Sequence, residues 1–79
     1  MLTVFEKKVN KQAGERVKIA RREIGLSQIE LAKMLGIAND RLCKYELGIV
    51  LVPAWVLIVV EEELLPEYRK NASKSVIQS

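Results

Sequence analysis

The chain has 79 residues, of which 49% are hydrophobic and 29% are charged, and its formal net charge is +3. This length allows one small domain and excludes a two-domain enzyme, and the composition is that of a chain that folds. Histidine is absent and Cys43 is the single cysteine, which excludes an intrachain disulfide, a Cys/His zinc site and a nucleophile activated by imidazole. We therefore expect no enzyme activity, no metal and no cofactor.

The charges are distributed unevenly along the chain. Residues 1–45 hold ten Lys and Arg against five Asp and Glu, a net of +5, whereas residues 46–79 hold three against five, a net of −2. A basic half suits a polyanion such as a nucleic acid, although many basic faces are only solvated surface. A lone thiol and the lack of a signal-peptide pattern lead us to expect a cytoplasmic location, at the nucleoid if the chain binds DNA.

The first part of the chain is predicted to be an N-terminal arm over residues 1–12. Its residues Thr3, Val4 and Phe5 have strand-like preferences, and a polar, basic stretch follows them. From Ala13 onward apolar residues recur at steps of three and four, with charged residues on the remaining faces. This spacing predicts a helix that ends near Gly25.

Two short helices are predicted next. Ser27-Gln28-Ile29-Glu30 has the form of a capping box, so a helix should begin there and end at Gly36, which tolerates positive φ. After the short connection Ile37-Ala38, a second helical pattern runs from Asn39 to Leu47 and is closed by Gly48. Two short helices joined by a tight turn that contains glycine have the outline of a helix-turn-helix.

Residues 47–60 are almost entirely apolar but contain Pro53, and they are too few to cross a bilayer. We therefore expect no membrane association. Pro53 suits the first position of a helix, which is predicted from Ala54 to Leu65 and stops before Pro66, although the β-branched residues in this run also favour a strand. Residues 66–79 are expected to be a tail, with at most a short helix before a disordered end.

The segment Gln28 to Glu46, Q-I-E-L-A-K-M-L-G-I-A-N-D-R-L-C-K-Y-E, resembles the Xre/Cro-type helix-turn-helix family of phage repressors and bacterial regulators. The resemblance includes residues 25–27 and Gly48, and extends less clearly over the first and fourth helices, about two-thirds of the chain in all. Its positions have physical reasons: Ala32 must be small for close packing, Gly36 makes the turn, and larger apolar residues fill the wedge between helices. These wedge residues are Ile37, Leu42 and Tyr45.

The resemblance implies an all-α, compact, four- to five-helix lambda-repressor-like DNA-binding domain over residues 13–65. It also implies that the helix Asn39 to Leu47 enters the major groove of DNA. Helical geometry agrees, because turning Leu42 and Tyr45 inward leaves Asp40, Cys43, Lys44 and Leu47 on the opposite face. The candidate base contacts are Asn39, Asp40, Cys43 and Lys44.

Specific roles follow for three of these residues. Asn39 is expected to pair with adenine, Lys44 with guanine and Asp40 with a cytosine amino group. Helix capping is the alternative for Asn39 and Asp40, and Asp40 and Lys44 can also pair with each other across one turn.

The candidate phosphate contacts are Gln28, Lys33 and Arg41. Gln28 matches a family position that binds phosphate at a helix N-terminus, whereas a solvated surface charge is the alternative for Lys33 and Arg41. The chain departs from the family at Ala38, where a capping Ser or Thr is common, and in the loop 49–52, which is apolar where family members are polar or basic. The apolar loop removes expected phosphate contacts, so either DNA affinity is weaker than the motif suggests or Lys7, Lys8 and Lys11 of the arm substitute for the loop.

The resemblance further implies a partly buried ion pair between Arg21 and Glu46, which ties the first helix to the reading helix. Such a pair fixes orientation more than it adds stability, although removing one partner can cost about 3–5 kcal/mol.

The apolar segment after Gly48 is expected to be shared with another chain, because so small a body cannot cover it alone. The predicted dimer or partner surface comprises Ile49, Leu51, Trp55, Val56 and Val59. Burial of Trp55 and its neighbours in the core of the monomer is the alternative. A symmetric dimer also suits DNA binding, since two reading helices about 34 Å apart contact half-sites one turn apart.

The sequence therefore predicts a sequence-specific binder of double-stranded DNA that acts as a dimeric transcriptional regulator, expected to be a repressor. The alternative is an antitoxin or other protein-interaction module that grips a toxin or another regulator through the apolar helix and autoregulates through the same motif. Glu61-Glu62-Glu63 suggests acid chemistry only weakly, because consecutive residues point in different directions around a helix.

Overall fold

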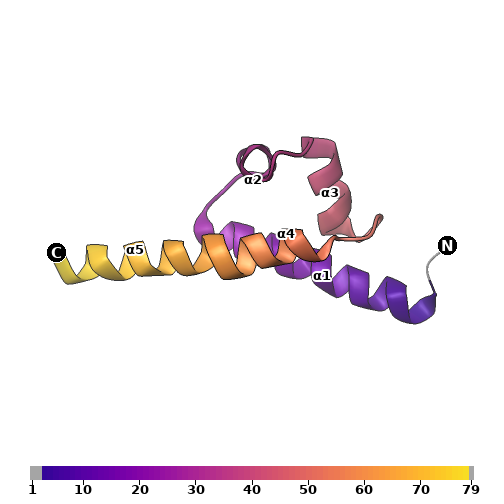
Figure 1. The fold of residues 1–79 in the computed structure, drawn as a ribbon, viewed down its shortest axis with the longest axis horizontal. Coiled ribbons are helices and arrows are strands. Elements are labelled where there is room, and N and C mark those ends of the chain that lie inside the picture. The colour runs from indigo at the N-terminus through magenta and orange to yellow at the C-terminus, as the bar shows by residue number, and fades with distance from the viewer. Residues whose placement is uncertain (1–2, 79) are drawn as a thin grey trace.

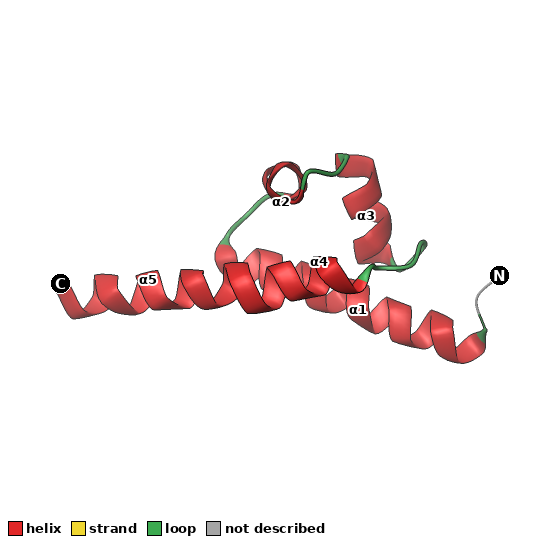
Figure 2. Ribbon diagram, viewed as in Figure 1, coloured by secondary structure: helices red, strands yellow, loops and turns green. Residues whose placement is uncertain are grey.

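A computed structural model describes residues 3–78 of the chain, and the side chains of residues 3–72. All regular structure in this range is helical, with no strand, and it forms four helical segments (Figures 1 and 2). Three of them are α1 (Val4–Ile24), α2 (Gln28–Leu35) and α3 (Asn39–Leu47). The fourth is a continuous helix made of α4 (Ala54–Ile58), the π-helical segment η1 (Val59–Leu64) and α5 (Leu65–Gln78).

The two long segments, α1 and the run from α4 to α5, pack against each other, and α2 and α3 lie on one side of them (Figure 1). Arg16 pairs with Glu61, and about two turns further along each helix Glu23 pairs with Arg69, so α1 and the run from α4 to α5 point in the same direction. The core lies between the four helical segments, and each of them contributes buried residues to it. Its buried apolar residues are Val17, Ala20, Leu31, Ala32, Leu42, Tyr45, Val56, Val60 and Leu65.

The first helix begins much earlier than the sequence predicted. Instead of an arm, residues 4–12 are the first turns of α1. A capping box starts them: the Thr3 hydroxyl accepts from the Glu6 amide and the Glu6 carboxylate accepts from the Thr3 amide, both at 3.1 Å. The strand-like preferences of Val4 and Phe5 are overridden because the cap and the packing of the following turns favour helix.

The boundaries of α2 and α3 agree with the prediction. The Ser27 hydroxyl accepts from the Glu30 amide at 3.1 Å and the Glu30 carboxylate from the Ser27 amide at 2.9 Å, which is the expected capping box. Gly36 ends α2 with φ of 71° in the left-handed region. Ala38 precedes α3 and supplies no side-chain cap, as expected because alanine has no polar side-chain atom.

The predicted stop before Pro66 does not occur. The helix passes through Pro66 and continues to Gln78, while Ser79 lies outside the described residues. The chain widens into π geometry over η1, where the Leu65 amide donates to the Val60 carbonyl, five residues back. Such a wide turn relieves the clash of a proline ring with the preceding carbonyls, so the helix survives. The predicted unstructured end is therefore part of α5 as far as the structure describes it.

Candidate functional site

The outer face of α3 is the candidate site. Leu42 and Tyr45 point into the core, with 0% and 3% of their surface exposed, as predicted. The opposite face is open to solvent, and Cys43 lies half-buried at its edge. The exposed residues on α3 are Asn39, Asp40, Arg41, Lys44 and Leu47.

Two of the candidate base contacts engage each other. Lys44 Nζ lies 3.2 Å from Asp40 Oδ2, an ion pair across one turn of α3, with both side chains largely exposed. Exposed pairs of this kind are worth a few tenths of a kcal/mol, about 0.3–0.5, so either partner is easily diverted to another ligand. Asn39 opens the helix beside them and is also exposed.

The candidate phosphate contacts occupy different surroundings. Arg41 is exposed and donates to the Tyr45 hydroxyl at 3.4 Å, a hydrogen bond that raises the pKa of the guanidinium above its ordinary value. Lys33 is exposed on α2. Gln28 is half-buried, and its Nε2 donates to Glu46 Oε1 at 3.1 Å. Because an amide nitrogen carries two hydrogens, Gln28 retains one for a second acceptor.

The predicted ion pair between Arg21 and Glu46 is present, and both side chains are largely shielded from solvent. Arg21 Nε donates to Glu46 Oε2 at 2.7 Å and Nη2 to Oε1 at 3.0 Å, and the Glu46 side chain is only 3% exposed. Arg21 also donates to the Leu26 carbonyl at 2.8 Å. Together with Gln28, this network joins α1, α2 and α3 at one point, so it fixes the direction in which α3 projects.

Gly14 is a structural residue that sequence reasoning missed. A Cβ at this position would overlap with the Tyr45 carbonyl oxygen and would lie 3.1 Å from that of Glu46, so α1 and α3 touch through their backbones here. A glycine inside a predicted helix is the signal that marks such an approach.

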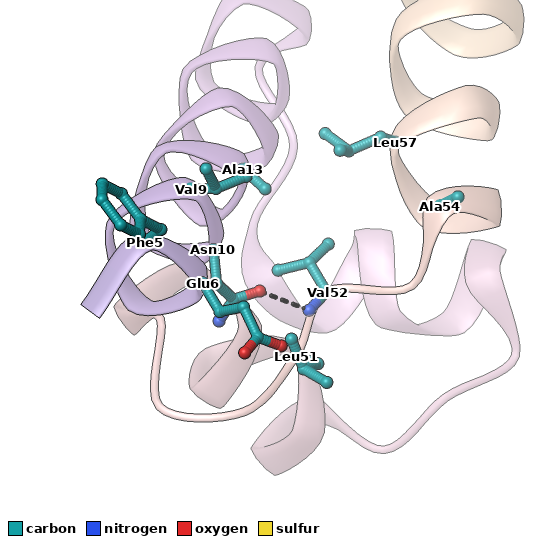
Figure 3. Close-up of a pocket in the computed structure, with 9 residues that line it drawn as sticks. All are labelled: Phe5, Glu6, Val9, Asn10, Ala13, Leu51, Val52, Ala54 and Leu57. Carbon is teal, nitrogen blue, oxygen red and sulfur yellow. Dashed lines mark hydrogen bonds between the residues drawn. The ribbon is translucent and has the colours of Figure 1, made fainter. Parts of the chain in front are cut away.

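Asn10 is the second missed residue, and it holds the loop after α3. It is 4% exposed, donates to the carbonyls of Gly48 and Val50 at 3.3 and 2.7 Å, and accepts from the Val52 amide at 2.7 Å (Figure 3). Its spacing from Gly14 and Val17 places all three on one face of α1, a pattern visible only if the helix is taken to begin before Ala13.

The N-terminal half of α1 runs beside the end of α3 and brings lysines there. A Cβ on Gly48, the residue that closes α3 with φ of 75°, would lie 3.1 Å from Lys11 Cα. Lys7 stands one turn earlier on the same side of α1, and both lysines are exposed. The cationic surface near α3 is therefore extended by α1.

The predicted dimer or partner surface is only partly available. Ile49, Leu51 and Trp55 are exposed, and Val59 is half-buried. Val56 is fully buried in the core, because α4 and η1 pack on α1 and turn Val56 and Val60 inward, so its assignment to an interface is wrong. For Val56 the alternative, burial within the monomer, is correct.

Side chains of α1, α4 and the loop between α3 and α4 line an apolar hollow, the α1/α4 groove (Figure 3). Its volume is about 420 Å³. The apolar lining residues are Phe5, Val9, Ala13, Leu51, Val52, Ala54 and Leu57.

No known protein family matches the chain, and a comparison with curated proteins finds no similar sequence. Within residues 3–78 no helix is both long enough and apolar enough to traverse a bilayer.

Proposed function

We propose that this chain is a sequence-specific binder of double-stranded DNA of the Xre/Cro helix-turn-helix type, acting as a homodimeric transcriptional repressor. The observation that carries the proposal is the state of α3: its outer side chains are exposed while its inner face is fixed to α1 and α2 by the Arg21 and Glu46 network. A rigid helix with a free polar face is what reading base edges in the major groove requires.

Base contacts are assigned to the first two turns of α3. The Asn39 side-chain amide makes two hydrogen bonds to adenine. Lys44 gives up its ion pair with Asp40 and donates hydrogen bonds to guanine O6 and N7. Asp40 then accepts from a cytosine amino group. Each well-formed pair contributes about 1–3 kcal/mol of discrimination against the wrong base.

Phosphate contacts are assigned to the residues that surround α3. Lys33 and Arg41 flank it, and Gln28 donates its remaining amide hydrogen at the N-terminus of α2, where free backbone amides favour an anion. The loop after α3 is apolar, and Lys7 and Lys11 of α1 supply the charge that it lacks. These contacts orient the protein without reading sequence.

Selection of bound duplexes from a random pool, repeated at two salt concentrations, tests the proposal. We expect enrichment of a two-fold symmetric site and affinity that falls steeply with salt, because phosphate contacts release counterions. Equal retention of every sequence would reduce the function to backbone attraction and would refute specific recognition. The alternative function, an antitoxin-like module, would bind DNA through the same motif. The two functions differ in the partner that covers the apolar surface near α4, which is a second copy of this chain for the repressor and a different protein for the antitoxin-like module.

A further inference from the structure

Leu47, the last residue of α3, is an apolar side chain on the face of the helix that is assigned to DNA. It is 61% exposed, and it belongs neither to the buried core nor to the apolar residues packed against that core. At about 100° per residue, Leu47 lies within about 20° of Asp40, so the two side chains share the centre of the outer face. None of the contacts proposed above uses Leu47.

Leu47 lies between two groups to which DNA contacts are assigned. Lys44 is one turn earlier on the same helix. Gly48 follows Leu47 directly and lies against Lys11, at the point where α1 extends past the C-terminal end of α3 (Figure 1). A duplex that binds Lys44 through a base and Lys11 through a phosphate therefore passes over Leu47.

The chemistry of the leucine side chain restricts what it recognises on DNA. It has no hydrogen-bond donor or acceptor, so it contacts a base only through apolar atoms. Base pairs present hydrogen-bonding groups in the major groove, and the apolar group among them is the C5-methyl of thymine. A cytosine amino group in the same place would lose its water against leucine and find no acceptor, which costs affinity. The base that suits Leu47 is therefore thymine.

A protein partner is the alternative occupant for this side chain, because Ile49 in the following loop is also exposed, at 63%. The surroundings of Leu47 favour DNA. It shares the outer face of α3 with Asp40 and Lys44, and charged residues are depleted at the centre of protein interfaces. Residues 48–60, which hold the predicted partner surface, contain no charged residue at all.

We propose that Leu47 recognises the C5-methyl group of one thymine in each half of the DNA site. This inference rests on the proposed function and adds one base of defined identity to the site. Leu47 follows Asp40 by seven residues, which is about 10 Å along the helix axis, and base pairs are stacked about 3.4 Å apart. The thymine is therefore expected within about three base pairs of the positions that Asp40 and Lys44 contact.

Replacement of thymine by deoxyuridine tests the contact, because it removes the C5-methyl group and changes nothing else. Each thymine of the selected duplex is replaced in turn, in both halves, and affinity is measured by fluorescence anisotropy. At one position we expect a loss of about fourfold per half-site, the effect of exposing one buried methyl group, and about tenfold or more when both halves are changed. Leu47→Ala should lose a similar factor on the thymine duplex and should bind the thymine and uracil duplexes equally.

Leu51→Ala is the matched control. Leu51 has a similar exposure, 58%, but it lines the α1/α4 groove and not the outer face of α3. This variant should keep the wild-type ratio of affinities for the two duplexes, since a weaker dimer lowers both affinities together.

The outcomes separate this inference from the proposed function. If a symmetric site is selected but no thymine within this range responds to uracil, Leu47 does not read a methyl group, and sequence-specific binding still stands. The same conclusion follows if Leu47→Ala keeps the wild-type sensitivity to uracil, and a change in its sedimentation would then assign Leu47 to a protein interface. A selection that enriches no sequence overturns both the proposed function and the role of Leu47.

Discussion

Gly14 of α1 packs directly on the main-chain carbonyl of Tyr45 in α3, so the two helices meet without an intervening side chain. This contact lies beside the buried Glu46 and two residues before Leu47, the last residue of the candidate reading helix. Because Gly14 has no Cβ, the backbones of α1 and α3 can lie in direct contact at this point.

Gly14→Ala is expected to destabilise the protein. In an open helix interior this change stabilises by about 1 kcal/mol, because alanine has the higher helix propensity. Here the new Cβ collides with a backbone carbonyl that can move only if a helix moves, and overpacking of this kind costs about 1–3 kcal/mol or more. Urea denaturation should show a net loss of stability. Gln12→Ala, at an exposed position of the same helix, should change stability by less than about 0.5 kcal/mol.

Asn10→Ala is expected to release the loop that follows α3. The change removes three hydrogen bonds to residues 48–52 and leaves partly buried backbone groups without their partners, at a cost of about 1–3 kcal/mol. Hydrogen exchange gives a sharper measurement, because the Val52 amide should lose its protection. Asn71→Ala is the control, since Asn71 is exposed on α5. A Val52 amide that stays protected in Asn10→Ala would contradict the assigned role.

The sequence predicted the segments whose structure is determined locally. The Ser27 and Glu30 capping box and Gly36 define both ends of α2, and Gly48 defines the C-terminal end of α3, since capping bonds and positive φ depend on neighbouring residues. The inward direction of Leu42 and Tyr45 followed from helical periodicity alone.

Features that depend on distant contacts were missed. The early start of α1 gains from Asn10, whose partners lie about 40 residues away in the loop after α3. The passage of the last helix through Pro66 depends on a π segment, which short-range propensity does not reveal. Burial of Val56 likewise follows from the packing of α4 on α1, while the composition of residues 47–60 shows only that the segment is apolar.

Glu46→Gln should destabilise the protein more than the double variant Glu46→Gln with Arg21→Met. The single change leaves the Arg21 guanidinium, only 11% exposed, beside a neutral amide, and breaking a buried pair in this way costs about 3–5 kcal/mol. The double variant removes the unpaired charge as well and should recover part of that loss. Thermal unfolding of the wild type, both single variants and the double variant measures the coupling. Equal stability of all four proteins would show that the pair has no structural role.

Stability is expected to fall on acidification through the capping carboxylates. Hydrogen bonds from the Ser27 backbone and side chain lower the pKa of Glu30 below its ordinary value of 4.5, and Thr3 does the same for Glu6. A carboxyl whose pKa is depressed by folding stabilises the protein above the unfolded-state pKa and loses this contribution as the pH falls through the folded-state pKa. The loss therefore lies below pH 4.5. Glu30→Gln keeps a capping box without a titrating group, so its urea midpoint should depend less on pH in this range than that of the wild type.

Lysines on α1 and α3 should affect DNA binding in different ways. Lys7→Ala and Lys11→Ala should each weaken binding to every duplex by a similar factor and reduce the slope of log affinity against log salt by about 2, because each removes one phosphate contact per chain and therefore two per bound dimer. Lys44→Ala should instead relax base preference at one position in each half of the selected site, at about 1–3 kcal/mol of lost discrimination. Glu15→Ala, an exposed change elsewhere on α1, should leave base preference unaltered.

Fluorescence anisotropy on the selected site and on single-base variants at several salt concentrations separates the two effects. A uniform loss for Lys44→Ala would move this residue from base reading to phosphate contact, because a lysine bound to the backbone cannot distinguish one base pair from another.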